Sequence, residues 1–493
     1  MRFLREFERF LSADLESVLA LHRTRDPARA ALDLFHDVAA DVPGYARFLA
    51  DRGVDPRTIT DSAAFRRLPT TSKADYHRAY PLSELCRGGR LSAGDFIAVS
   101  SGSTGEPTFW PRAGHDEFGT VRRFEQVLVD SFDVASKKTL GVVCFALGSW
   151  VGGMYTTFAC RQLALKGYPL TLVTPGNNRA EILRVIRALS PQFEQVVLLG
   201  YPPFLKDVID AGRAEGFAWH EQPVGLITAG EVFSEAWRGL VAERLGQRDV
   251  TRGTASLYGT ADGGVLANET PLSVRIRRFL ADQPSAAREL FGEARLPTLC
   301  QYDPLHRYFE LDGDQLLFSG DGSVPLLRYR ILDRGGVLPF DAMLAFLRDH
   351  GFDPLDPALD PRVRAREQPF VFVFGRSGFA LSFYGANIYP ENVTVGLEQP
   401  EVSAEVTGKF VMQLAHSREQ DVELEVVVEL APRAVGSDAL AAALSRAIRS
   451  QLELQNSEFL NYAPAERRTP RVRLLPFADP EYFPLGVKHR STR

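Results

Sequence analysis

Residues 139–230 constrain the fold most, because short apolar runs alternate there with segments whose apolar residues recur at helical spacing. The apolar runs predict strands at Thr139–Phe145, Pro169–Val173, Gln195–Gly200 and Val224–Thr228. The segments between them predict helices at Met154–Leu165, Arg179–Leu189 and Phe204–Glu215. Buried strands separated by helices form parallel βαβ units, so the sequence predicts an α/β fold.

The rest of the chain predicts two additions to this α/β core. Residues 300–335 read as a β-meander with a turn at Asp312-Gly313. A strand at Phe370–Phe374 then stops at Gly375 and Gly378, which are suited to a domain joint. A smaller unit follows, with strand, helix and strand at Val422–Leu430, Ser437–Leu454 and Arg471–Leu475. We expect an N-terminal nucleotide- and acid-binding domain, 1–375, and a small mobile α+β C-terminal lid domain, 376–493.

The N-terminal region predicts helices. Residues 1–50 read as two amphipathic helices, with Phe3, Phe7 and Phe10 at helical spacing in the first. Pro69 is expected to end one element and Ser72 to cap the next helix.

Composition excludes several classes of function. The 493 residues are 45% hydrophobic and 24% charged, which is ordinary for a globular protein. A net charge of −5 gives no basic footprint for nucleic acid. Four cysteines lie far apart and nine histidines do not gather at metal-ligand spacing, which argues against a zinc site or a disulfide framework. No run reaches the roughly twenty apolar residues of a membrane span. We expect a cytoplasmic protein with no nucleic-acid or membrane partner; the sequence does not predict its oligomeric state.

The segment after the strand-like run Phe96–Val99 is rich in serine, threonine and glycine, Ser100-Ser101-Gly102-Ser103-Thr104-Gly105. Its backbone can turn sharply and direct amides and hydroxyls at one anionic point. It lacks the Gly-Lys-Ser/Thr ending of a Walker loop and the spacing of a dinucleotide fingerprint. The segment has two interpretations: it is either a phosphate-binding loop or a plain surface turn.

Three further loops follow predicted strands, at the sheet edge where parallel sheets bind ligands. Gly200–Pro203 sets Tyr201 on a rigid turn suited to lining a pocket, although a packed turn explains it equally well. Ala229-Gly230-Glu231 joins a small backbone to a carboxylate. Ser256–Gly264 combines Tyr258, a hydroxyl and the carboxylate of Asp262, a composition suited to stacking on a base and holding a hard cation.

Six segments, in this order, resemble the AMP-forming adenylating (acyl-CoA synthetase) superfamily, and especially its phenylacetate-CoA ligase branch. They are Ser100–Thr108, Ala229–Glu231, Tyr258–Asp262, Arg328–Asp333, Gly375–Ser377 and Gly385–Val393. Each motif alone is weak, but six in register are a strong signal. The resemblance implies a carboxylate that attacks ATP to form an acyl-adenylate, after which an acceptor displaces AMP.

The resemblance also implies roles for individual residues, with ATP and Mg²⁺ as cofactors. Asp262 stands where the family usually has a magnesium-binding glutamate, and Lys488 resembles the C-terminal lysine that neutralises charge on the α-phosphate and the attacking carboxylate. The expected ATP- or AMP-binding residues are Ser100, Ser101, Gly102, Ser103, Thr104, Gly105, Ala229, Gly230, Glu231, Tyr258, Gly259, Thr260, Asp333 and Arg376. Tyr201, Pro203 and Tyr258 are expected to line the acid pocket.

The chain departs from the family pattern at three positions. Glu106 stands where the phosphate loop usually carries a lysine, Ala261 replaces a hydroxyl residue, and Gly378 replaces an aspartate at the hinge. These changes leave three functions open. The first is activation of a small-molecule acid, aromatic or otherwise hydrophobic, with CoA as acceptor. The second is adenylation with an amine or carrier protein as acceptor, or of another oxyacid such as nitrite. The third is a nucleotide-binding module without turnover.

Overall fold

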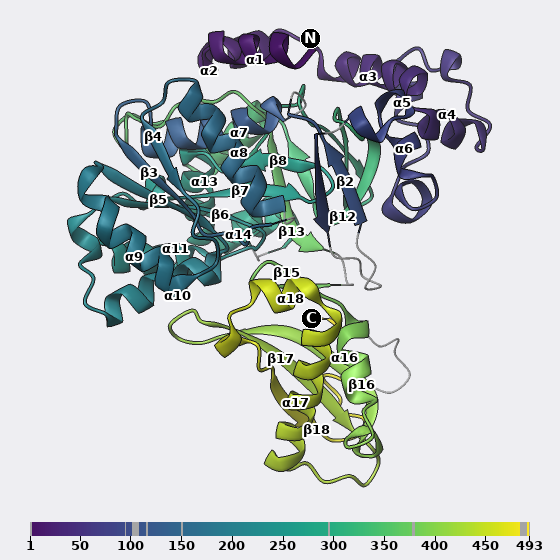
Figure 1. The fold of residues 1–493 in the computed structure, drawn as a ribbon, viewed down its shortest axis with the longest axis vertical. Helices are drawn as coiled ribbons and strands as arrows, with labels where there is room; N and C mark the ends of the chain where they lie inside the picture. Colours follow the sequence, from purple (N-terminus) through teal and green to yellow (C-terminus); the bar gives the residue numbers. More distant parts are fainter. Residues whose placement is uncertain are drawn as a thin grey trace. The chain divides into compact units, whose positions relative to one another are not determined.

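The computed structural model of the protein describes residues 2–93, 95–100, 108–114, 117–148, 151–293, 296–376, 380–483 and 491–492. Contacts divide the chain into two compact units (Figure 1). The large unit comprises residues 1–100, 109–200 and 208–375. The small unit comprises residues 101–108, 201–207 and 376–493.

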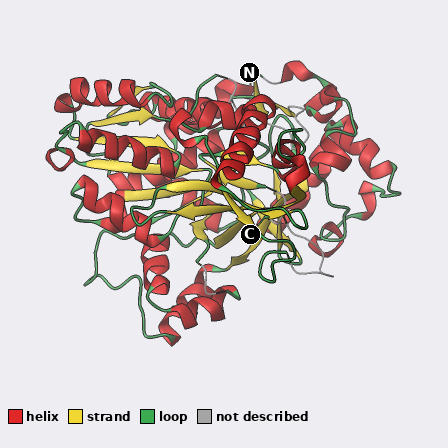
Figure 2. Cartoon of the chain, turned by 90° about the horizontal axis from the view of Figure 1, so that it is seen from below, coloured by secondary structure: helices red, strands yellow, loops and turns green. Residues whose placement is uncertain are grey.

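One sheet of eleven strands, ordered β10-β11-β12-β13-β9-β8-β7-β6-β5-β3-β4, runs through the large unit. Its parallel half is β3 (Thr139–Val143), β4 (Leu170–Val173), β5 (Gln195–Gly200), β6 (Val224–Ala229) and β7 (Thr254–Thr260). The connections between these strands contain α8 (Val151–Leu165), α9 (Arg179–Leu189), α10 (Pro202–Ala214), α11 (Glu235–Leu245) and α12 (Val250–Gly253). Figure 2 shows helices on both sides of the strands, so the predicted α/β fold is confirmed.

The other half of the sheet contains the predicted meander. Its strands are β8 (Gly264–Asn268), β9 (Thr298–Gln301), β10 (Tyr308–Asp312), β11 (Gln315–Gly320), β12 (Leu326–Leu338) and β13 (Phe370–Arg376). The meander β10-β11-β12 is antiparallel and extends the main sheet through β13, so it is not a separate layer. In β12, Arg328 and Leu332 have positive φ values of 46° and 67°, and the pairing with β11 shifts register.

The N-terminal region differs from the two helices predicted for residues 1–50. It forms four: α1 (Arg2–Ser12), α2 (Leu15–Arg23), α3 (Pro27–Asp41) and α4 (Pro43–Ala50). The prediction was wrong because the spacing of apolar residues does not show where capping residues divide the segment into separate helices. Asp14 and Asp26 accept backbone N–H groups at the starts of α2 and α3, and proline opens both α3 and α4.

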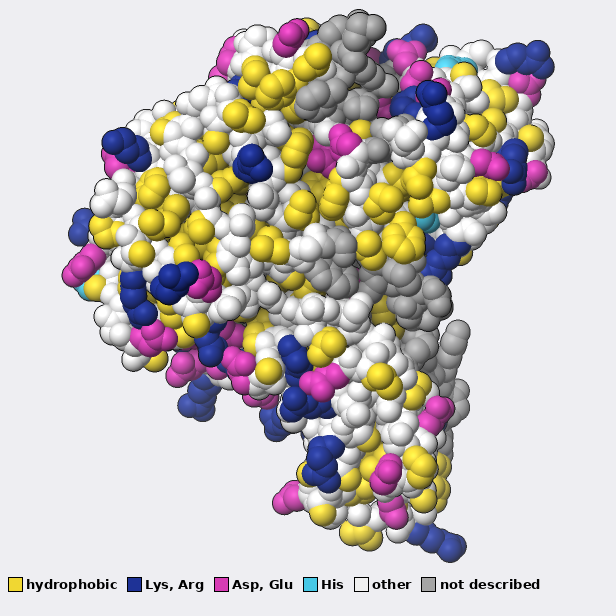
Figure 3. Space-filling view, in the orientation of Figure 1, with side chains coloured by type: hydrophobic (Ala, Val, Ile, Leu, Met, Phe, Trp, Pro, Cys, Tyr) yellow, Lys and Arg dark blue, Asp and Glu magenta, His cyan; other side chains and the backbone are white. Residues whose placement is uncertain are grey.

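The remaining elements of the large unit surround the sheet. They include the helices α5 (Ser62–Phe65), α6 (Leu82–Leu85), α7 (Phe118–Phe132), α13 (Pro271–Ala281), α14 (Pro284–Phe291) and α15 (Phe340–Asp349). A separate two-stranded sheet is formed by β1 (Phe96–Ser100) and β2 (Thr108–Arg112). On the face drawn in Figure 3, basic and acidic side chains are interspersed. In the part of the chain that the structure describes, no helix combines the length and apolarity needed to cross a bilayer.

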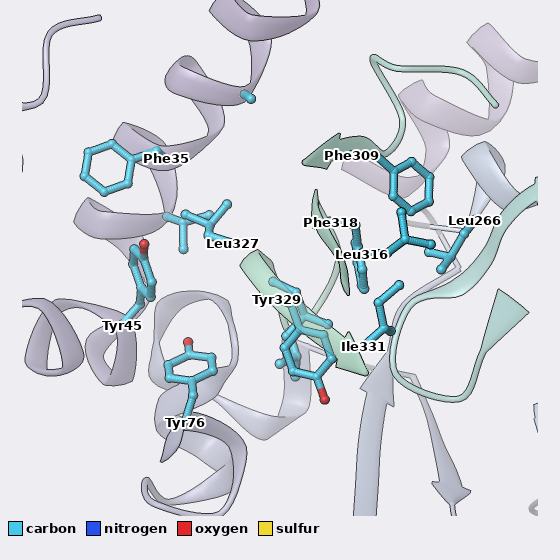
Figure 4. Packing of buried hydrophobic residues seen from close by; sticks show 14 of the residues in the cluster. Phe35, Tyr45, Tyr76, Leu266, Phe309, Leu316, Phe318, Leu327, Tyr329 and Ile331 are labelled. Carbon is cyan, nitrogen blue, oxygen red and sulfur yellow. The ribbon is translucent and has the colours of Figure 1, made fainter. Parts of the chain in front are cut away.

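A hydrophobic core cluster rich in aromatic side chains packs the N-terminal helices against β12 (Figure 4). Phe35 of α3 is fully buried, and Tyr45 of α4 is 1% exposed. From β12, Leu327, Tyr329 and Ile331 enter the same cluster. Burying one such side chain contributes about 1.5–3 kcal/mol, so this cluster fixes the position of Tyr329 firmly.

The small unit is an α+β structure. Its sheet is β16 (Val406–His416), β17 (Val422–Leu430) and β18 (Arg471–Leu475), with β17 and β18 parallel on either side of α17 (Asp438–Gln455) in the chain. The unit also contains β14 (Leu381–Phe383), β15 (Ala386–Ile388), α16 (Pro390–Leu397) and α18 (Ser457–Tyr462). The three elements predicted at 422–430, 437–454 and 471–475 are present, while β16 was not predicted.

Candidate active site

Two neighbouring parallel strands bring six of the predicted nucleotide residues to one edge of the sheet. Ala229, the last residue of β6, pairs with Leu257 of β7. Gly230 follows with a φ of 85°, a conformation that favours glycine. Glu231 therefore leaves β6 beside the end of β7, where Tyr258, Gly259 and Thr260 lie. The Thr260 hydroxyl accepts a hydrogen bond from the Gly263 N–H at 3.0 Å, which closes the turn after β7.

The predicted residues Tyr258 and Asp333 are in direct contact although 75 positions separate them. The Tyr258 hydroxyl donates to Oδ2 of Asp333 at 2.6 Å, and both side chains are buried. Leu332, in its left-handed conformation, immediately precedes Asp333. Non-glycine residues in this region cost about 1–3 kcal/mol and cluster at functional sites. The local backbone conformation of β12 therefore directs the Asp333 carboxylate toward β7.

The predicted residue Asp262 makes the reciprocal contact. The Tyr329 hydroxyl donates to Oδ2 of Asp262 at 2.7 Å. Tyr258 precedes Asp262 by four residues, and Tyr329 precedes Asp333 by four. Each tyrosine thus binds the carboxylate that follows the other tyrosine, and the two hydrogen bonds join the end of β7 to β12.

Lys73 is a site residue that the sequence analysis did not single out. Its Nζ lies 3.0 Å from Oδ1 of Asp262, and its side chain is 29% exposed. Lys73 opens the short helix η2 (Lys73–His77), and Ser72 caps this helix as predicted. Thr71 holds the segment beside β12, because its N–H donates to the Arg328 carbonyl at 3.1 Å. No motif marks this lysine; only the helix cap before it is visible in the sequence.

His77, at the other end of η2, is buried with its ring centroid 4.0 Å from that of Trp110. Burial lowers the pKa of His77 to about 4, and the nearby Asp262 carboxylate opposes this shift. The imidazole is therefore neutral at pH 7. Lys73 remains the cation that pairs with Asp262 on this side of the site.

The donor set at Asp262 decides how the site can hold magnesium. Within the described residues, no group of three or more His, Cys, Asp or Glu side chains is arranged to hold a metal ion. Mg²⁺ is usually bound through one or two carboxylates together with substrate phosphates and waters. Asp262 supplies one carboxylate, which Tyr329 and Lys73 already contact. These residues fit magnesium that arrives with a nucleotide and not a resident metal centre.

Other predicted residues lie elsewhere or cannot be described. Tyr201 and Pro203 fall in the small unit, where the Tyr201 ring lies 5.3 Å from that of Tyr462 and also faces Gly385. Their role in an acid pocket stays a prediction. Ser101, Gly102, Ser103, Thr104, Gly105 and Lys488 lie outside the described residues, as do the side chains of Ser100 and Arg376. Glu106 and Gly378 lie outside them as well.

Comparison with known proteins identifies relatives in sequence and in fold. No family model matches the chain. Phenylacetate-coenzyme A ligase of Thermus thermophilus is 24% identical over 376 residues, which cover 73% of this chain and 72% of that protein. The crystal structure of 2-hydroxyisobutyryl-CoA ligase with 2-HIB-AMP and CoA, in the thioesterification state, matches with a TM-score of 0.63 at 14% identity. That match covers 95% of this chain and 88% of the ligase. An open conformation of the same ligase matches with a TM-score of 0.55, also at 14% identity, over 95% of this chain and 90% of that one.

The fold and these relatives support the resemblance to the AMP-forming, adenylate-forming ligases, because the chain shares its fold with 2-hydroxyisobutyryl-CoA ligase and its sequence is similar to that of a phenylacetate-coenzyme A ligase. Within that class, its sequence is similar to the phenylacetate-CoA ligase branch. The resemblance stated from the six motifs is confirmed.

Proposed function

We propose that the protein activates a carboxylic acid with ATP and transfers the acyl group to CoA. In the first step a carboxylate oxygen attacks the α-phosphorus of ATP, the bond to the β-phosphate oxygen breaks, and pyrophosphate leaves. In the second step the CoA thiol loses its proton and attacks the acyl carbon, and AMP leaves. The sequence relative and the structural neighbour are CoA ligases by name, which supports CoA as acceptor.

One observation carries the proposal. Two buried carboxylates, Asp262 and Asp333, are held by tyrosine hydroxyls near the carboxyl end of β7, and a lysine pairs with one of them. We assign Asp333 to the ribose hydroxyls and Asp262 to magnesium bound by the phosphates. When bound, magnesium would neutralise phosphate charge.

Lys73 gives the site a cation that the phosphate loop lacks. Glu106 stands where that loop usually has a lysine, so the loop itself offers less positive charge. Lys73 lies 3.0 Å from Asp262 and is partly exposed, so its ammonium can turn toward a phosphate oxygen. A positive charge beside the reacting phosphate stabilises the transition state strongly where water is excluded. We assign to Lys488 the matching role on the α-phosphate and the attacking carboxylate, delivered by residues 376–493 as a lid on the domain of residues 1–375.

Apolar side chains favour a hydrophobic acid. Leu147 follows β3, Met154 lies on α8 and Val232 follows β6, and each is more than a third exposed. Exposed apolar groups at the carboxyl ends of parallel strands are typical of a binding pocket. The chain also contains 33 phenylalanines, so an aromatic acid is our first choice. We include Tyr201, Pro203 and Tyr258 as pocket residues of this proposal.

The test measures pyrophosphate release from ATP across a panel of aromatic, branched and linear acids, with and without CoA. We expect release that depends on an aromatic or other hydrophobic acid, and turnover that depends on CoA. A turnover rate indifferent to CoA would replace CoA with another acceptor, such as an amine or a carrier protein. ATP binding without pyrophosphate release from any acid would favour a binding module.

A further inference from the structure

Two arginines hold three successive carbonyl groups of the turn after β7. Nη2 of Arg112, the last residue of β2, donates to the carbonyls of Ala261 at 2.6 Å and Asp262 at 2.7 Å. Nη2 of Arg307, which precedes β10, donates to the carbonyl of Gly263 at 2.8 Å. Every peptide carbonyl from residue 261 to residue 263 therefore points toward a guanidinium group.

The turn is also confined sterically. A Cβ added at Gly264, whose φ is 70°, would lie 3.2 Å from the Tyr155 ring. A Cβ added at Gly263 would lie 2.7 Å from the ring of Phe318. The Arg112 guanidinium lies 5.5 Å from the centre of the Tyr155 ring, so the same tyrosine contacts both the turn and Arg112. With packing on its sides and guanidinium groups at its carbonyls, the turn has little freedom.

Arg112 carries a charge that is energetically unfavourable to bury at this position. Its side chain is buried, and within the described part of the chain no carboxylate forms an ion pair with it. Burying a charge costs several kcal/mol unless other interactions offset it. In the described part of the chain, the side-chain hydrogen bonds of Arg112 are those to the carbonyls of Ala261 and Asp262. A buried cation whose side-chain hydrogen bonds, among the described residues, all go to the backbone of a site turn is explained if the position of that turn matters for function.

We propose that Arg112, assisted by Arg307, is a positioning residue of the active site. Its guanidinium fixes the peptide units of the turn and thereby directs the Asp262 carboxylate toward Lys73 and the bound nucleotide. The proposal rests on the proposed adenylation function. It adds that the orientation of the Asp262 carboxylate depends on a backbone clamp, the hydrogen bonds from Arg112 and Arg307 to the backbone of the turn, and not only on the hydroxyl of Tyr329.

The first test is amide hydrogen exchange of the whole protein without ligand, read on peptides covering residues 257–268. The variants are Arg112→Met and Arg112→Lys. The control is Arg275→Met, because Arg275 is equally buried and also donates to a backbone carbonyl, that of Pro354 at 2.7 Å. We expect about tenfold faster exchange in this turn for Arg112→Met, a smaller effect for Arg112→Lys and none for Arg275→Met. Unchanged amide hydrogen exchange of this turn in Arg112→Met would contradict the claim that Arg112 holds the turn in place.

The second test links the clamp to Asp262 through a double-mutant cycle on pyrophosphate exchange into ATP. If Arg112 acts through Asp262, Arg112→Met slows exchange, and Arg112→Met combined with Asp262→Asn is no slower than Asp262→Asn alone. Independent, additive losses would overturn the positioning role. If Arg112→Met does not fold, Arg112→Lys enters the same cycle. Absence of exchange in the unmodified protein would reject the proposed function, and the hydrogen-exchange result would still decide the clamp.

Discussion

At the scale of single residues, the ion pair between Lys73 and Asp262 is the feature on which the proposed chemistry depends most. Asp262 is buried, whereas Lys73 keeps a partly exposed side chain. A buried carboxylate needs a cation near it, and joining two anions at a phosphate needs positive charge. One lysine can meet both needs in turn, first with Asp262 and then with the nucleotide.

Replacing Lys73 by methionine should therefore affect both stability and activity. We expect the loss of the ion pair between Lys73 and Asp262 to lower Tm and to slow pyrophosphate exchange about 100-fold. The control is Lys137→Met, since Lys137 forms a comparable pair with Asp133 at 3.6 Å on the exposed surface. Equal effects of the two substitutions on exchange would contradict the role of Lys73.

His77 gives a pH dependence of stability whose sign follows from its lowered pKa. The folded state holds His77 neutral down to about pH 4, whereas the unfolded chain binds a proton near pH 6.5. Its contribution is therefore complete above pH 6.5 and is lost as the pH falls from 6.5 to 4, by about 3 kcal/mol in total. We expect His77→Gln to show a smaller fall in Tm between pH 7 and pH 4.5 than the unmodified protein. Burial also lowers the pKa of His306. Because His306 is present in both proteins, its contribution cancels from the difference in Tm. An identical fall in Tm in the two proteins would contradict the assignment of this pH dependence to His77.

At the scale of elements, β7 and β12 are joined by the exchanged tyrosine–aspartate pairs. We propose that Tyr258 and Asp333 serve the ribose side of the site, and that Tyr329 and Asp262 serve the phosphate side. Because the aromatic rings are fixed by packing, the hydroxyls arrive at the carboxylates already oriented. The division of labour between the two pairs is testable.

Removing each hydroxyl should affect a different kinetic constant. We expect Tyr258→Phe to raise KM for ATP, because Asp333 loses its orientation, and Tyr329→Phe to lower kcat, because Asp262 does. A hydrogen bond to a charged group contributes about 1.5–3 kcal/mol, so each effect should reach tenfold. Tyr80→Phe is the control, since the Tyr80 hydroxyl donates at 2.7 Å to Asp51, a carboxylate of the N-terminal region that has no predicted role in the site. The same kinetic change in both site variants would refute the division.

The sequence predicts the elements better than their contacts. Strands such as Gln195–Gly200 and Val422–Leu430 are read correctly because apolar runs bounded by turn residues are local signals. The contact of Tyr258 with Asp333 depends on packing between distant strands, so spacing alone does not predict it. Lys73 shows the same limit, since its partner is 189 positions away in the chain. Family resemblance named Asp262 and Asp333, but it gave neither the exchanged tyrosine bonds nor the clamp of Arg112.

At the scale of the whole molecule, the chain changes unit between Gly375 and Arg376. Gly375 has a φ of 104°, and a Cβ added there would meet no atom of the described residues within 4 Å. A side chain at this position would therefore strain the backbone without a clash. We propose that this glycine lets residues 376–493 change orientation during the reaction.

Gly375→Ala should slow turnover with CoA several-fold while leaving ATP affinity unchanged, because the left-handed conformation costs alanine about 1–2 kcal/mol. Gly351→Ala is the matched control, since Gly351 has a φ of 73° and equally open surroundings inside the large unit. Equal turnover in the two variants would contradict a joint at Gly375.

The central claim is that a carboxylate oxygen attacks the α-phosphorus of ATP. Supplying the acid with both carboxylate oxygens labelled with ¹⁸O, together with ATP and CoA, tests it directly by mass spectrometry of the products. The account predicts AMP that carries one ¹⁸O atom and pyrophosphate that carries none. Unlabelled AMP, or formation of ADP with label in inorganic phosphate, would contradict it.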